Sequence, residues 1–232
     1  MKALDVNERD TRGGSAHRAG ARRRRAERQL ATLRAYHEAG HAVVAWLRGF
    51  HLKRVSIVGH GIEGGSCEYQ FVIRAPRGAG RARAASRTRA VIRAARASAA
   101  VAVAGAVAQD EVLLGLGCVA VDPRSGWPLP LFSPGADVDE RVAYRLAGWV
   151  YRDAKGRTAF LRRMRTATQR VLTRAENWAA VRTLAARLLR QRALDGESAS
   201  ECIRRVIARS APIRSAPSRR NHAQRAARSC TC

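Results

Sequence analysis

The stretch YHEAGHAVVAW, residues 36–46, decides how the rest of the chain is interpreted. It contains His37, Glu38 and His41 as an H-E-x-x-H motif, inside a segment, residues 27–48, whose apolar side chains recur every three or four positions. That period is typical of a helix with one buried face. Because residues four apart lie on the same face of a helix, both imidazoles can reach one metal ion. The motif therefore predicts a helix that carries two Zn²⁺ ligands.

Glu38 directly follows the first histidine of the motif, so its carboxylate lies beside such an ion rather than on it. This is the position of a general base that takes a proton from zinc-bound water. Chance would place the motif in roughly 0.7% of sequences with this histidine and glutamate content. The alternative is a pair of core histidines held by hydrogen bonds, but two imidazoles in one apolar stripe would each need a buried partner. A shared metal ion satisfies both, and we favour it.

A catalytic zinc site needs a third protein ligand and one open position. Asp137 is followed three residues later by Glu140, which is typical of a capping box and explains Asp137 as the residue that begins a helix. Asp139 shares a helical face with Val142 and Leu146, and a carboxylate on a buried face needs a strong partner. Periodicity therefore favours Asp139 over Asp137. The other residues with suitable donor atoms are Glu63, Glu68, Asp110, Glu111, Glu140, His51 and His60.

The composition favours packed helices over a β-sandwich. Hydrophobic residues make up 46% of the chain but aromatic residues only 5%, so the core must be built mostly from alanine, valine and leucine. Two short β-like segments, KRVSIV at 53–58 and SCEYQFVI at 66–73, flank a glycine-rich stretch that suits a turn. We therefore expect a mainly α fold with a small β-hairpin after the HExxH helix. Further helices are predicted at 84–114, 138–153, 157–175, 177–193 and 197–209.

The chain divides into one domain and two basic ends. Residues 1–26 are predicted to be a flexible arm, residues 27–209 one domain and residues 210–232 a disordered tail, because neither end shows apolar periodicity. No secretory signal is visible, and the most apolar run, 99–108, has about half the length of a membrane span. The five cysteines form no C-x-x-C pair, so they indicate neither a zinc ribbon nor a disulfide framework and favour a reducing compartment. These features predict a cytoplasmic protein without a transmembrane segment.

The formal net charge is +26, and all but three of the 44 basic residues are arginine. A surface of this kind attracts nucleic acid or anionic lipid through long-range electrostatics. A coding bias toward arginine would give the same composition without any such partner, and most charge runs are solvated surface. The charge is therefore compatible with a nucleic-acid partner but does not by itself indicate one.

Four further segments follow HEAGHAVVAW in the order KRVSIV at 53–58, AGAVAQDEVLLG at 104–115, GADVDERVAYRLA at 135–147 and NWAAVRTLAARLLRQRALDGE at 177–197. Over roughly residues 30–205, this order resembles that of the peptidase domain of FtsH-type ATP-dependent zinc metalloproteases. The resemblance implies a zincin-like helical metallopeptidase fold in which His37, His41 and Asp139 bind Zn²⁺. It implies that Glu38 is catalytic, and that the protein is a metalloendopeptidase acting on unfolded proteins or peptides.

The chain departs from that family in several respects, one of which is that GHGIEGG at 59–65 replaces the family's usual motif after the first strand. No G-x-x-x-x-G-K-[ST] motif is present, so we expect an enzyme without its own ATPase, which leaves open an ATPase partner in trans and a homo-oligomer. The family's acidic pair within AGAVAQDEVLLG is here Gln109 and Asp110, which moves a supporting carboxylate role onto Asp110.

Two other function classes remain open. One is a zinc-binding regulatory or scaffold protein with weak catalysis, and the other is a basic polyanion-binding protein. Zinc content combined with a peptidase assay tests the first class. Salt-dependent binding to DNA or RNA tests the second, because phosphate contacts release counterions.

Overall fold

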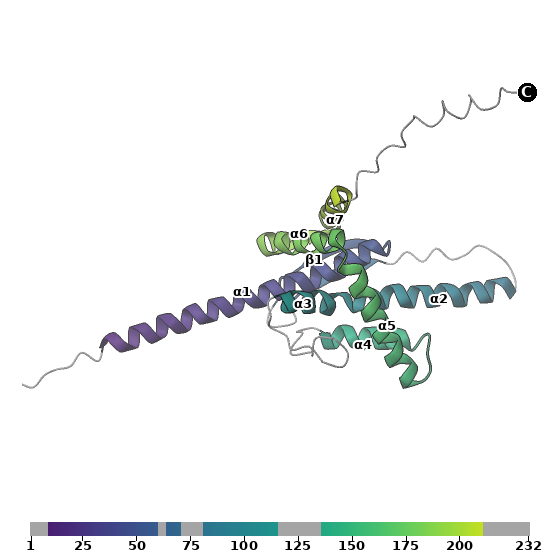
Figure 1. Cartoon of the computed structure of the whole chain (residues 1–232), viewed down its shortest axis with the longest axis horizontal. Helices are drawn as coiled ribbons and strands as arrows, with labels where there is room; N and C mark the ends of the chain where they lie inside the picture. The colour runs from purple at the N-terminus through teal and green to yellow at the C-terminus, as the bar shows by residue number, and fades with distance from the viewer. Residues whose placement is uncertain (1–8, 60–63, 71–80, 116–135, 211–232) are drawn as a thin grey trace, which may run out of the picture.

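The computed structural model describes residues 9–59, 64–70, 81–115 and 136–210 of the chain (Figure 1). Its elements, in chain order, are α1 (Arg9–Leu47), β1 (His51–Ser56), β2 (Ser66–Gln70), α2 (Arg81–Ala102), α3 (Ala104–Gly115), α4 (Ala136–Ala147), α5 (Ala154–Leu172), α6 (Ala175–Gln191), β3 (Ala193–Asp195) and α7 (Gly196–Ser210). The predicted mainly α architecture, with a small hairpin after the HExxH helix, is therefore confirmed.

Helix α1 is much longer than the helix predicted from residue 27. Figure 1 shows its N-terminal part projecting from the body of the molecule, while the rest passes through the core. Residues 21–30 are exposed, whereas Ala35, Ala39 and Ala42 are fully buried. Apolar periodicity reports burial, so it marks only the packed part of a helix. The projecting part belongs to the predicted arm, and residues 211–232 of the predicted tail lie outside the described residues.

Two packed clusters hold the helices together. The main core joins α1, α3, α6, α7 and the sheet, and its fully buried side chains include Val43, Leu184 and Ile203. The second cluster joins α2, α4 and α5, where Ala143 and Phe160 are buried. The main core therefore positions the H-E-x-x-H helix, and the second cluster positions α4, which carries Asp139.

The closest approach between α1 and α3 depends on a glycine. A Cβ atom on Gly40 would lie 2.6 Å from the carbonyl oxygen of Ala104 and 2.7 Å from the Cβ of Ala108. Both distances are shorter than van der Waals contact, so the two helices can pack this closely only because Gly40 has no side chain. Gly40 lies inside the H-E-x-x-H motif, and this packing brings α3 against the face that carries the two histidines.

We expect Gly40→Val to lower the free energy of unfolding by about 2 kcal/mol or more, because the added side chain overpacks a core contact made by backbone atoms. Urea denaturation followed by circular dichroism measures the change. The matched control is Gly115→Val at the end of α3, where an added Cβ meets nothing within 4 Å. Equal destabilisation by both substitutions would show that the close contact does not constrain the helix pair.

The sheet contains one strand that the sequence did not indicate. Its order is β2-β1-β3, with β1 antiparallel to both neighbours, so Val55 pairs with Cys67 on one side and with Leu194 on the other. Strand β3 follows α6 and has only three residues. A strand of this length is too short for its alternation of side chains to be recognised in the sequence. As a result β1 is central, and β2 is an edge strand of the described sheet.

Two helix boundaries differ from the predictions. The helix expected at 84–114 is interrupted at Val103, which separates α2 from α3. The helix expected at 138–153 ends at Ala147, and Asp153 is instead the N-cap of the next helix, α5. Its Oδ1 accepts a hydrogen bond from the Gly156 N–H at 2.6 Å, which is an N-cap contact that the periodicity did not reveal.

Helix α4 begins at Ala136, one residue before the Asp137 that was predicted to precede it as the N-cap. Asp137 therefore lies in the first turn of the helix, and its side chain is outside the described residues. The sequence therefore located the start of this helix to within two residues, but the prediction of Asp137 as its N-cap was wrong.

By length and composition, one helical stretch of the described chain, 89–115, is apolar enough to cross a membrane. In the folded chain 61% of the most apolar window is buried, and the core helix of a protein that is not in a membrane passes the same test. The stretch is also interrupted at Val103. The absence of a transmembrane segment stays a prediction.

Candidate metal centre

Three side chains from two helices converge at one point. His37 and His41 project from α1, and Asp139 projects from α4. The Oδ2 atom of Asp139 lies 3.0 Å from the Nε2 atom of each histidine, and the two Nε2 atoms are 2.9 Å apart. These three residues form a group that could hold a metal ion. The helix-face prediction that placed both histidines and Asp139 at one site agrees with this arrangement.

The orientation of His41 is fixed by a main-chain hydrogen bond. Its Nδ1 lies 2.7 Å from the carbonyl oxygen of Val101, deep in the protein. Because a carbonyl oxygen only accepts, Nδ1 carries a hydrogen, which leaves Nε2 as the ring atom that faces Asp139 and His37. A backbone acceptor of this kind commonly orients a histidine that binds a metal.

The donor set and the surrounding space both fit a metal ion. Two imidazole nitrogens and one carboxylate oxygen are donors that zinc accepts in catalytic sites. Gly105 on α3 faces them, and a Cβ atom there would lie 2.5 Å from the Nε2 atoms of both His37 and His41. The site thus depends on a residue without a side chain. The Nδ1 of His37 is buried without a hydrogen-bond partner among the described residues, which leaves it available to a water molecule.

The negative charge of Asp139 and the positive charge of His41 stabilise each other. Burial alone would raise the pKa of Asp139, but hydrogen bonds from His37 and His41 hold it well below its usual range. Burial alone would lower the pKa of His41, but the hydrogen bond to Asp139 and the charges of Asp139 and Glu38 raise it to about 9. A proton therefore binds tightly where the three side chains meet, and a metal ion has to displace it.

Glu38 lies beside this group without bonding to it in the described structure. The residue is 5% exposed, and burial raises the pKa of its carboxyl, while the neighbouring His41 and His37 oppose the rise. Gly65, which precedes β2, faces the carboxylate, since a Cβ atom there would lie 2.2 Å from Oε1 of Glu38. Glu38 is thus enclosed between the HExxH helix and the hairpin, next to the donor atoms and not among them.

A cavity of about 370 Å³ opens over the group. Its walls come from α1, from α4 and from β2, and they include the apolar side chains of Leu33 and Val142. Cys67 and Tyr69 of β2 also face it; burial raises the pKa of the Cys67 thiol and raises that of Tyr69 to about 12, so both are neutral near pH 7. The cavity therefore gives access to the His37–His41–Asp139 group from the side of the hairpin.

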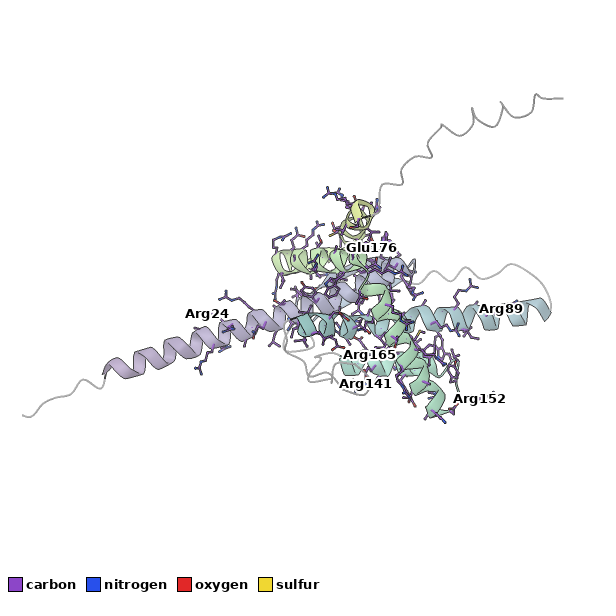
Figure 2. The ribbon with its side chains drawn as sticks, viewed as in Figure 1. Arg24, Arg89, Arg141, Arg152, Arg165 and Glu176 are labelled. Carbon is purple, nitrogen blue, oxygen red and sulfur yellow. The ribbon has the colours of Figure 1, made fainter. Side chains whose placement is uncertain are left out.

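The other carboxylates considered as ligands have different partners. Asp110 bonds to Arg165 of α5, which Figure 2 labels, and Arg165 also lies 3.6 Å from Glu140. Glu111 accepts a hydrogen bond from Gln169 at 2.8 Å. The supporting role expected of Asp110 is therefore not found, since no described contact joins it to a histidine. Glu68 and His51 are exposed on their strands, while Glu63 and His60 lie outside the described residues.

Sequence reasoning missed two residues of the site. Val101 supplies the carbonyl that orients His41, and Gly105 supplies the space in front of both histidines. A main-chain acceptor has no side-chain signal. The only sequence feature near Gly105 is the run of small residues at 104–106, which fits tight helix packing and did not by itself indicate a metal centre.

No known protein-family model matches the chain, and no curated protein matches it. The family resemblance described above therefore rests on the motifs of this sequence alone.

Proposed function

We propose that the protein is a zincin-like, zinc-dependent metalloendopeptidase without its own ATPase. The observation that carries the proposal is the convergence of His37, His41 and Asp139 within 3.0 Å, with the buried Glu38 beside them. Three ligands with one open position, next to a carboxylate that is not a ligand, are the requirements for metal-assisted hydrolysis of a peptide bond. The resemblance to the FtsH-type peptidase domain supports the same assignment.

When bound, zinc supplies a water of lowered pKa and polarises the scissile carbonyl. Glu38 accepts the proton of the attacking water and delivers it to the amine as the peptide bond breaks. The enclosure of Glu38 by α1 and the residues before β2 keeps bulk water away from that proton. The hydrogen bond from His41 to the Val101 carbonyl holds the ring in the tautomer that faces the metal.

The edge strand β2 suits an extended substrate. Its residues Ser66, Cys67 and Tyr69 line the cavity over the metal group, and only one side of the strand pairs with β1. An extended peptide can add to such an edge through main-chain hydrogen bonds. This mode of binding requires an unfolded segment of the substrate and depends little on the sequence of that segment. Unfolded proteins or peptides are therefore the proposed substrates. An ATPase partner in trans, assembly into a homo-oligomer and a cytoplasmic location remain parts of this proposal.

The first test is the metal content. We expect the purified protein to carry about one zinc ion per chain and His41→Ala to lose it, because the substitution removes one of three donor atoms. Elemental analysis after gel filtration measures the ratio. The matched control is His51→Ala, which removes an exposed imidazole on β1 and should leave the zinc content unchanged. Equal zinc in wild type and His41→Ala would contradict the proposed site.

A further inference from the structure

A second cavity, of about 590 Å³, lies between the C-terminal end of α1 and the exposed face of α2. Its charged lining consists of four arginines, Arg48, Arg89, Arg93 and Arg96, and it contains no acidic residue. The remaining lining residues are apolar, with Ile92 among them. We call this cavity the arginine groove. It shares no residue with the cavity over the metal group.

The arginine groove follows from the pattern of α2. Arg89, Arg93 and Arg96 are spaced by four and three residues, so they lie on one face of the helix, while Ala94 and Ala95 are buried on the other. At 1.5 Å per residue, the three arginines span roughly 10 Å along the helix axis. Figure 2 shows Arg89 on the part of α2 that extends from the body, at the opposite end of the molecule from Arg24 in the projecting part of α1.

These four guanidinium groups have no acceptor among the described residues. Elsewhere on the described surface, arginines do pair with carboxylates, as Arg23 does with Glu27 and Arg205 with Glu201. Four like charges around one hollow repel each other, and only water and salt ions screen them in the free protein. An anion with several charges would offset this repulsion, so the arginine groove suits a polyanion.

We propose that the arginine groove binds the phosphate backbone of double-stranded nucleic acid. The planar guanidinium matches phosphate with two parallel hydrogen bonds. One strand of a duplex advances 3.4 Å per phosphate, so an arginine row of roughly 10 Å spans about three phosphates. The lining contains no aromatic side chain on which an unpaired base could stack, which favours the backbone of a duplex over a single strand.

The shape of the site also distinguishes nucleic acid from a membrane. A lipid surface is flat, and a helix that binds it places an apolar face between the basic residues and the acyl chains. Here the guanidinium groups line a hollow between two helices, which accepts a narrow charged strand. Contacts to phosphates carry no base information, so binding is independent of sequence. The net charge of +26 adds long-range attraction to any nucleic acid.

The test uses the full chain and two fluorescent duplexes of about 20 base pairs, one of DNA and one of RNA with the same sequence. Fluorescence anisotropy is measured over a series of salt concentrations. The triple variant Arg89→Gln, Arg93→Gln, Arg96→Gln should weaken binding at least tenfold near 0.1 M salt. It should also reduce the slope of log K against log salt by roughly 2.7, the contribution of three phosphate contacts. The difference between the two duplexes tells which nucleic acid is preferred.

The matched control removes the same charge from exposed arginines on α5 and α6 with Arg162→Gln, Arg170→Gln and Arg182→Gln. It should change the affinity less than threefold. Zinc content and circular dichroism show whether each variant is folded, and the single reversal Arg93→Glu provides a second, smaller perturbation that should weaken binding more than Arg162→Glu. Equal losses in both triple variants would overturn the proposal, because binding would then follow net charge. Tighter binding to phosphatidylserine vesicles than to either duplex would overturn it as well.

Discussion

Glu38→Gln is expected to lower kcat/KM for the cleavage of unfolded casein by 10²–10⁴-fold while the protein keeps about one zinc ion per chain. The substitution preserves the size of the side chain but removes the group that takes the proton from the attacking water. Glu38 contributes no donor atom to the His37–His41–Asp139 group, so the metal content should not change. Casein digestion and elemental analysis on the same preparation measure both quantities.

The control for this experiment is Glu197→Gln, an identical chemical change at an exposed position on α7. It should cleave casein as fast as the wild type. Wild-type cleavage rates in Glu38→Gln would show that another group is the base. A wild-type protein that holds zinc but cleaves no substrate would instead favour the zinc-binding regulatory or scaffold protein.

Asp139→Asn should weaken zinc binding by 10–100-fold or more, extrapolating upward from the effect of changing a residue that only supports a ligand. The amide replaces an anionic oxygen by a weakly coordinating one. It also cannot accept hydrogen bonds from both imidazoles with the strength of a carboxylate, which Asp139 does at 3.0 Å from each. Casein cleavage should fall close to background. Competition with a fluorescent chelator gives the zinc affinity.

Asp137→Asn is the matched comparison, because it makes the same change two residues earlier on α4. Asparagine is also tolerated at the start of a helix, so stability should change by well under ~1 kcal/mol and the metal should stay in place. The reverse ranking of the two variants would assign the ligand to Asp137. If neither variant lost zinc, the search for the third ligand would move to Glu63, Glu68, Asp110 or Glu111, of which Glu63 lies outside the described residues.

The site was predictable where a local pattern specified it. The four-residue spacing of His37 and His41 placed both rings on one helix face, and the apolar neighbours of Asp139 showed that its carboxylate pointed inward. The contacts between elements were not predictable in this way. Gly105 faces the histidines only because α3 packs against α1, and a glycine among alanines has no pattern that reports what it approaches.

The fold was likewise predictable where a local sequence pattern exists and unpredictable where none does. The packed helices were located, although α1 begins at Arg9 rather than 27 and α4 ends at Ala147 rather than 153, whereas β3 was missed because three residues have no period. The arginine-rich part of α1 was predicted to be a flexible arm because it has no apolar periodicity, and its residues 21–30 are exposed. Arginine has a high helix propensity, so an exposed run of it can continue a helix that the core has already started.

His41 and Asp139 are 98 residues apart in the sequence, and the helices that carry them, α1 and α4, pack into the main core and the second cluster respectively. An ion held between them would therefore act as a cross-link that closes a long loop and limits the conformations of the unfolded chain, as a disulfide does. Removal of the ion would release α4 and α5 from α1 before the main core was disturbed. Loss of the metal and loss of amide-exchange protection in α4 and α5 would then occur together. A chelator would lower the protection of these two helices while leaving that of the main core unchanged.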